Sequence, residues 1–173
     1  MKNNFFKIIL LFFYFLLTCN LSYSDEFNFD VTEIEILENG KIFKGLKRGK
    51  VTTNDGVILN ADEFEYNKVT NVLTANGNVK IFDKINNYLI TSNKLIYLRN
   101  KNIIFTSGNS KAESVNDNLK IEADNLEYNK ILNKIIAEKN VFIEDKINKN
   151  QIFADKISYF KNEEKILTFG KTR

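Results

Sequence analysis

Residues 61–81 read ADEFEYNKVTNVLTANGNVKI, and residues 123–143 repeat much of this string as ADNLEYNKILNKIIAEKNVFI. In the longer windows 57–87 and 119–149, 15 of 31 positions are identical. The clearest shared slot is a tyrosine that recurs every 31 residues, at Tyr66, Tyr97, Tyr128 and Tyr159. A fixed period of this length indicates stacked repeats, each of which buries its apolar face against its neighbours.

The repeats alternate like strands. Leu73, Ala75, Gly77, Val79 and Ile81 fall at every second position, with polar residues between them, which predicts one buried and one solvated face. Each repeat therefore supplies about two long strands joined by polar loops. We expect an opening unit at 27–56 and repeats at 57–87, 88–118, 119–149 and 150–173.

Three further slots share the 31-residue period. They are the small residues Ala61, Ser92, Ala123 and Ala154; the polar slot Asp62, Asn93, Asp124 and Asp155; and the glycines Gly77, Gly108 and Gly170, with Lys139 as the exception. The alternation changes phase directly after the small residue, which predicts a β-bulge or corner there. The acid is then a turn device. Calcium binding is the alternative, but it needs six or more oxygen ligands, and no second acid recurs at a fixed spacing.

The N-terminus resembles a secretory signal peptide of residues 1–24. Lys2 and Lys7 precede the apolar run Ile8–Leu17, and small residues stand near the expected cleavage after Ser24. A retained anchor is the alternative, although the run is shorter than the roughly 20 residues that span a bilayer. Lipidation of Cys19 is disfavoured because a threonine precedes it.

Beyond residue 24 the chain has no Cys, His, Pro or Trp, and it carries 23 basic and 22 acidic residues. The usual metal ligands, general base and thiol nucleophile are therefore missing, and we expect no enzyme activity, no metal and no cofactor. The pair Glu63 and Glu65 is the alternative for a glycosidase, but these residues fall on the solvated face. The nearly balanced charge disfavours nucleic acid as a partner.

The pattern Ala61-Asp62-x-Phe64-x-Tyr66-Asn67, followed by Asn71-x-Leu73-x-Ala75-x-Gly77-Asn78-Val79-x-Ile81, resembles the OstA-like domain of lipopolysaccharide-transport proteins. It is most similar to the N-terminal periplasmic domain of LptD and more distantly to LptA. The resemblance covers about 27–173, with two departures: Lys139 replaces the glycine, and 107–110 lacks the valine.

The resemblance implies an all-β, antiparallel β-jellyroll or β-taco for residues 25–173. It implies an interior that holds the lipid A acyl chains of lipopolysaccharide, and end-to-end strand pairing with sister domains in a bridge across the periplasm. The expected location is the periplasm, with attachment to the outer membrane as an alternative. The pattern stops within a strand at Arg173, which favours a longer native chain over a free-standing unit.

The expected lipid-binding residues are the inward apolar side chains: Leu59, Phe64, Leu73, Val79, Ile81, Ile90, Leu95, Ile104, Ile121, Leu126, Ile135, Val141, Ile143 and Ile157. The alternative is that they form a dry core, in which case the protein is a structural or adhesive β-solenoid. The tyrosine slot is expected to pack structurally, and the basic cluster Lys44, Lys47, Arg48 and Lys50 to form a solvated loop rather than meet lipid phosphates. Partner strands are expected to add near Phe27–Ile36 and Ile166–Thr172.

Overall fold

The computed structural model describes residues 27–114, 116 and 118–173, and the expected signal peptide at 1–24 lies outside this part of the chain. Among the residues described, no helix is long and apolar enough to span a membrane. The regular structure there is β-strand, apart from three short 3-10 helices, η1 (Glu38–Gly40), η2 (Arg99–Lys101) and η3 (Lys161–Glu163).

Thirteen strands form a single antiparallel sheet, so the expected all-β fold class is confirmed. The strands are β1 (Phe27–Val31), β2 (Ile34–Leu37), β3 (Ile42–Gly45), β4 (Gly49–Thr53), β5 (Val57–Ala61), β6 (Glu63–Asn67), β7 (Val72–Asp83), β8 (Tyr88–Leu98), β9 (Ile103–Ser114), β10 (Leu119–Asn129), β11 (Lys134–Asp145), β12 (Asn150–Phe160) and β13 (Lys165–Thr172). Asparagine supplies the left-handed backbone at many turns, for example at Asn71, Asn102 and Asn133, because its short polar side chain tolerates this conformation.

The sheet divides on one side of β7. From β7 to β13 every strand pairs with its neighbours in the chain. On the other side, β5 pairs with one half of β7 and leads to β4 and β1, while β6 pairs with the other half and leads to β3 and β2. The opening unit therefore places the β2–β3 hairpin in one branch and the β1–β4 pair in the other.

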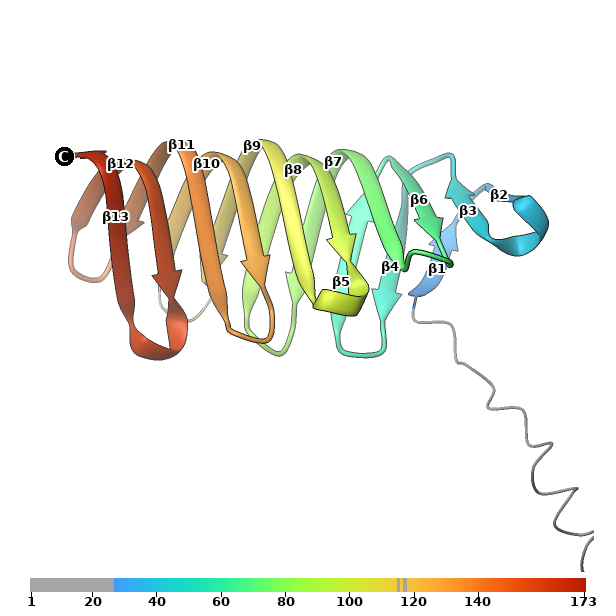
Figure 1. Ribbon diagram of the computed structural model, residues 1–173, viewed down its shortest axis with the longest axis horizontal. Coiled ribbons are helices and arrows are strands. Elements are labelled where there is room, and N and C mark those ends of the chain that lie inside the picture. The colour runs from blue at the N-terminus through green and yellow to red at the C-terminus, as the bar shows by residue number, and fades with distance from the viewer. Residues whose placement is uncertain (1–26, 115, 117) are drawn as a thin grey trace, which may run out of the picture.

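Each long strand bends near its middle, where the pairing register shifts, as between Asn76 and Val79 in β7. The bends follow one long edge of the molecule and the hairpin turns follow the other, so the sheet is folded into two layers (Figure 1). We call the layer that holds β2, β3, β6 and the four slot tyrosines the tyrosine arm. The layer that holds β1, β4 and β5 is the opposite arm, and the edge where the turns of the two arms meet is the mouth.

The acid and glycine slots build the bend together. Gly77 has a φ of +75°, and a Cβ at this position would stand 2.5 Å from Oδ2 of Asp62. The side-chain amide of Asn78 donates a hydrogen bond of 2.8 Å to the same oxygen. In the last repeat the backbone N–H of Lys171 donates to Asp155 over 2.8 Å. The prediction that this acid slot is a turn device is confirmed.

Side chains alternate across the bend without losing their inward direction. In β7, Leu73, Ala75, Val79 and Ile81 are all buried. In β10 the buried positions change parity at the bend, after Ala123, and the irregular pairing there lets both halves of that strand face the same interior. The result is one hydrophobic cluster that runs from β1 to β12 between the arms.

Candidate functional site

The interior between the arms brings together all fourteen side chains that the sequence indicated as inward. Each belongs to the same hydrophobic cluster, and none exposes more than 3% of its surface. Leu73 and Leu95 belong to the tyrosine arm, whereas Ile81 and Ile90 belong to the opposite arm. The two arms are closed upon each other in this structure, because these side chains are shielded from water.

Aromatic rings from both arms close the interior on the side of the mouth, and one of them, Tyr88, was not predicted from the sequence. Tyr88 of the opposite arm meets Tyr128 edge to face, with ring centroids 5.1 Å apart. Phe27 makes similar contacts with Tyr66 at 4.7 Å and Tyr97 at 5.8 Å. The repeat could have predicted that Tyr88 is buried, because Tyr88 occupies the same position of the 31-residue repeat as the buried residues Val57 and Leu119.

Basic side chains cross the mouth from the tyrosine arm. Arg99 Nη1 lies 3.1 Å and Lys130 Nζ 2.6 Å from the same atom, Oδ2 of Asp55, in the β4–β5 turn of the opposite arm. One repeat further on, Lys161 Nζ donates to the carbonyl oxygen of Asn86 over 2.9 Å. Both the Lys130–Asp55 and the Lys161–Asn86 pairs are 75 residues apart in the chain, so the closure repeats with the fold.

A buried carboxylate supports this closure. Asp83 is fully buried, and its Oδ2 accepts a hydrogen bond of 2.9 Å from the Tyr128 hydroxyl across the mouth. Its Oδ1 accepts from the backbone N–H groups of Ile85 at 3.0 Å and Asn86 at 3.1 Å. A buried charge is tolerated when its oxygen atoms are bonded in this way. Tyr128 therefore packs in the interior and also ties the two arms together, whereas the hydroxyls of Tyr66 and Tyr97 donate to Asn71 and Asn102 of their own arm.

The ionisation of these groups fits a closed mouth. Burial alone would raise the pKa of Asp55, but the hydrogen bonds from Lys130 and Thr53 and the nearby charges of Lys130 and Arg99 hold it below its ordinary value of 3.8. Burial raises the pKa of Tyr97 to about 12, and burial together with the Asp83 charge raises the pKa of Tyr128. At neutral pH the carboxylate is charged and both phenols are hydrogen-bond donors.

The cations at the mouth share one slot, two residues after the tyrosine, at Lys68, Arg99, Lys130 and Lys161. This slot was a readable signal that sequence reasoning left unused. The basic cluster that it did single out lies elsewhere. Lys44, Lys47 and Lys50 of that cluster form exposed ion pairs with Glu65, Glu33 and Asp30, respectively.

Two other candidates lie on the outer surface. Glu63 and Glu65 are both exposed, and Glu65 is paired with Lys44. In the part of the chain that the structure describes, no three His, Cys, Asp or Glu side chains gather as they would around a metal ion. The acids of the corner slot instead bond to neighbouring backbone or asparagine groups.

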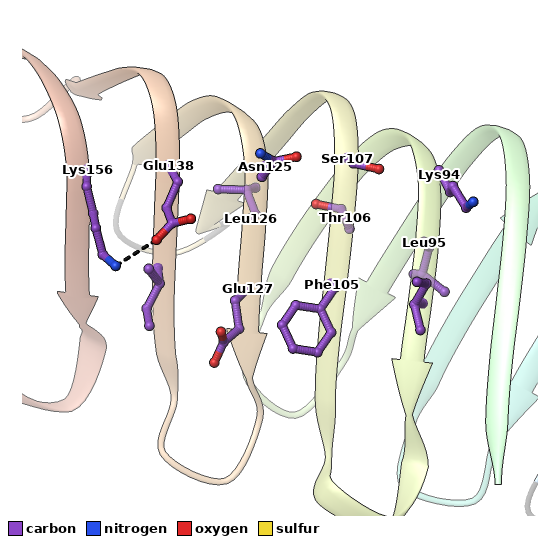
Figure 2. Close-up of a pocket in the computed structure, with 12 residues that line it drawn as sticks. Lys94, Leu95, Phe105, Thr106, Ser107, Asn125, Leu126, Glu127, Glu138 and Lys156 are labelled. Atoms are coloured by element: carbon purple, nitrogen blue, oxygen red, sulfur yellow. Dashed lines mark ion pairs between the residues drawn. The ribbon is translucent and has the colours of Figure 1, made fainter. Parts of the chain in front are cut away.

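A shallow cavity of about 320 Å³ lies on the outward face of the tyrosine arm, near the bend (Figure 2). Its wall includes Phe105, Glu127 and Ile136, which alternate along their strands with the inward residues. An ion pair of 2.6 Å between Lys156 and Glu138 borders it. Its wall also includes Leu95 and Leu126, which belong to the interior cluster, so the cavity lies directly over the apolar interior.

Both ends of the stack present strand edges. At the first end, Ile34 and Ile36 of β2 are exposed, and at the last end Leu167 and Phe169 of β13 are exposed. These positions fall in the two segments where the sequence predicts that partner strands add.

The fold and the interior define a class of protein: an open-edged, two-layer β-jellyroll of stacked repeats around a continuous apolar interior. The family model for the LptA/(LptD N-terminal domain) LPS transport protein matches residues 59–165, and this chain belongs to that family. The resemblance drawn from the repeated slots is thus confirmed. Membership supports a role in lipopolysaccharide transport, and the family is one of transport proteins rather than enzymes.

A solved structure shows the same fold. It is the crystal structure of LptH, the LptA homologous periplasmic component of the conserved lipopolysaccharide transport device from Pseudomonas aeruginosa. The two chains are 16% identical, the match covers 68% of this chain and 84% of that chain, and the TM-score is 0.62. No curated protein sequence matches the chain.

Proposed function

We propose that this protein binds the acyl chains of lipopolysaccharide between its two arms and passes the lipid across the periplasm toward the outer membrane. The observation that carries the proposal is the continuous apolar interior, bounded by arms that are covalently continuous at the bends and joined by side chains at the mouth. Family membership and the periplasmic location given for LptH support it.

The closed interior requires that the arms part along the mouth before lipid enters. Acyl chains would then replace contacts between the arms, and each CH₂ buried contributes about 0.8 kcal/mol. Binding of this kind needs no specific polar contacts inside the groove. Transfer is exchange between similar apolar interiors in adjoining domains.

The partners in this proposal are lipopolysaccharide and other β-jellyroll domains of the transport bridge. The exposed edges at β2 and β13 suit end-to-end pairing, because an unpaired edge offers backbone N–H and C=O groups to another strand. The sheets of successive domains would then continue into one another, and so would their interiors.

A photo-crosslinking amino acid placed at single positions tests the groove. Labelled lipopolysaccharide should be captured from the buried positions Leu73 and Leu126. Capture should be absent at the outward positions Lys80 and Glu127, which lie on the same two strands, β7 and β10. Equal capture at inward and outward positions, or no capture at all, would refute lipid binding between the arms.

A structural or adhesive β-solenoid is the second candidate, and the tightly closed interior is the observation that favours it. In that case the fourteen inward residues serve only as a core. The crosslinking experiment separates the two, since a scaffold captures no lipid from Leu73 or Leu126 while it folds normally.

A further inference from the structure

We propose that Arg99 and Lys130 form a phosphate-binding rim at the mouth, with Lys161 one repeat further along, and that Asp55 occupies this rim as an internal counter-ion while the mouth is closed. The ligand class is the phosphomonoester headgroup of an amphiphile whose acyl chains lie in the interior. The proposal rests on the proposed function and specifies the headgroup chemistry.

The two cations converge on a single oxygen atom. Arg99 Nη1 and Lys130 Nζ both lie within ion-pair distance of Oδ2 of Asp55, at 3.1 Å and 2.6 Å. An arginine and a lysine that share one anionic oxygen are an arrangement suited to phosphate as well as carboxylate. The Asp55 carboxylate therefore stands where an oxygen of a bound phosphate would lie.

The rim is shielded from water, which sets it apart from ordinary surface lysines. The side chain of Lys130 is 6% exposed and that of Arg99 is 15% exposed. Charges in such surroundings interact more strongly with an anion than they do in bulk water, and they are costly to leave unpaired. The basic cluster at Lys44–Lys50 lacks this property, because its ion pairs are exposed.

Opening of the mouth separates the rim from its counter-ion, because Asp55 lies on the opposite arm. Arg99 keeps its position on the tyrosine arm, where Nη1 donates to Asn102 Oδ1 over 2.7 Å and to the Tyr97 hydroxyl over 3.2 Å. The same movement therefore exposes the apolar interior and frees two positioned cations beside it. A phosphorylated lipid that enters acyl chains first would place its headgroup at this rim.

A third basic side chain, Lys161, extends the rim along the stack. Lys161 lies one repeat beyond Lys130, a rise of roughly 10 Å for two strands. It donates to Asn86 O and to Ser114 Oγ, at 2.9 Å and 3.1 Å, on the opposite arm. An amphiphile with a second phosphate would find a second cation in the direction of the stack.

Lipid selectivity is the first test. With the crosslinker at Leu126, capture is titrated with bisphosphorylated lipid A and with the same lipid after enzymatic removal of its phosphates. Wild type should bind the phosphorylated form at least about tenfold more tightly. Arg99→Gln/Lys130→Gln should bind both forms equally, whereas Asp55→Asn, which also breaks the closure, should keep or increase the preference. The charge-matched control, Lys101→Gln/Lys149→Gln, changes two exposed lysines outside the cation slot and should behave as wild type.

The results for these variants distinguish failure of the phosphate-binding rim from failure of the proposed function. A preference that survives in Arg99→Gln/Lys130→Gln, or that falls in Asp55→Asn, overturns the rim. If wild type captures both lipids equally, the proposal of a phosphate-binding rim is wrong, whereas lipid binding between the arms is still supported. If no variant captures either lipid, the proposed function fails.

Inorganic phosphate provides a readout that does not depend on lipid. Asp55→Asn removes the carboxylate that Arg99 and Lys130 share in the closed state, so millimolar phosphate should raise the melting temperature of this variant. Wild type and Arg99→Gln/Lys130→Gln should not respond. Equal stabilisation of wild type would mean that the rim binds free phosphate rather than a lipid headgroup, and no stabilisation of Asp55→Asn would overturn the rim.

Discussion

Gly77→Ala should destabilise the protein through the bend rather than through the core. A non-glycine residue at the φ of +75° costs about 1–2 kcal/mol. The new Cβ would also stand 2.5 Å from Oδ2 of Asp62, so this carboxylate must move and weaken its hydrogen bond from Asn78. That loss adds about 1–2 kcal/mol, and the reduced freedom of the unfolded chain returns about 0.4–1 kcal/mol.

The net expectation is a fall of about 2–3 kcal/mol in the free energy of unfolding, measured by urea titration with far-ultraviolet circular dichroism. Gly40→Ala is the matched control. Gly40 also has a positive φ, of +85°, but no atom lies within 4 Å of the position of its Cβ. It should therefore show the backbone cost alone, about 1 kcal/mol.

The opposite substitution can be made in another repeat, where a lysine stands in place of the glycine. Lys139 occupies the glycine slot of its repeat with a φ of 67°, so Lys139→Gly should leave stability unchanged or raise it by up to about 1 kcal/mol. In an Asp62→Ala background the penalty of Gly77→Ala should shrink toward that of Gly40→Ala, since the two residues are coupled by contact. If Gly77→Ala proves no more costly than Gly40→Ala, the account of the bend is wrong.

Three further predictions concern the interior and the mouth. Leu95→Ala removes a fully buried side chain and should lower the free energy of unfolding in urea by about 2–5 kcal/mol, whereas a loss below about 1 kcal/mol would show that the arms are loosely packed. Tyr128→Phe takes one donor from the buried Asp83 and should cost about 1–3 kcal/mol, with faster amide exchange in the turns of the mouth; unchanged exchange would show that this bond does not hold the arms. Because the pKa of Asp55 is lowered in the folded state, the stability that its charge provides is complete above its ordinary value of 3.8 and is lost as pH falls through the lower, folded-state value. The stability difference between wild type and Asp55→Asn should therefore be constant near neutral pH and decline in strong acid, and a difference that does not change with pH would contradict the ion pairs at the mouth.

The sequence predicted the parts of the fold that one repeat encodes. Alternation along residues 72–83 gave the inward side chains, and the change of phase after Ala61 gave the bend, because both depend on neighbours a few residues apart. The corner acid at Asp62 was recognised for the same reason. Because the motif recurs in register, the same local geometry can be predicted independently from several repeats.

The closure of the mouth could not be derived in this way. Its contacts join Asp55 to Arg99 and Lys130, residues 44 and 75 positions away on the other arm, and alternation does not give the distance between two layers. The sequence also did not predict that the β1–β4 pair and the β2–β3 hairpin belong to different arms, because a terminal unit lacks the register of the repeats.

The repeated closure bears on the proposed passage of lipid along the interior. Lys130 contacts Asp55 at 2.6 Å and also lies 3.9 Å from Asp83, which belongs to the next strand pair of the opposite arm. Each such cation therefore couples two successive turns, so parting the arms at one repeat weakens the closure of the next. In a stack whose repeats contact mainly their neighbours, opening can advance repeat by repeat without unfolding the whole sheet. A lipid could then move along the interior behind a local opening, while the bends on the far edge hold the arms in register.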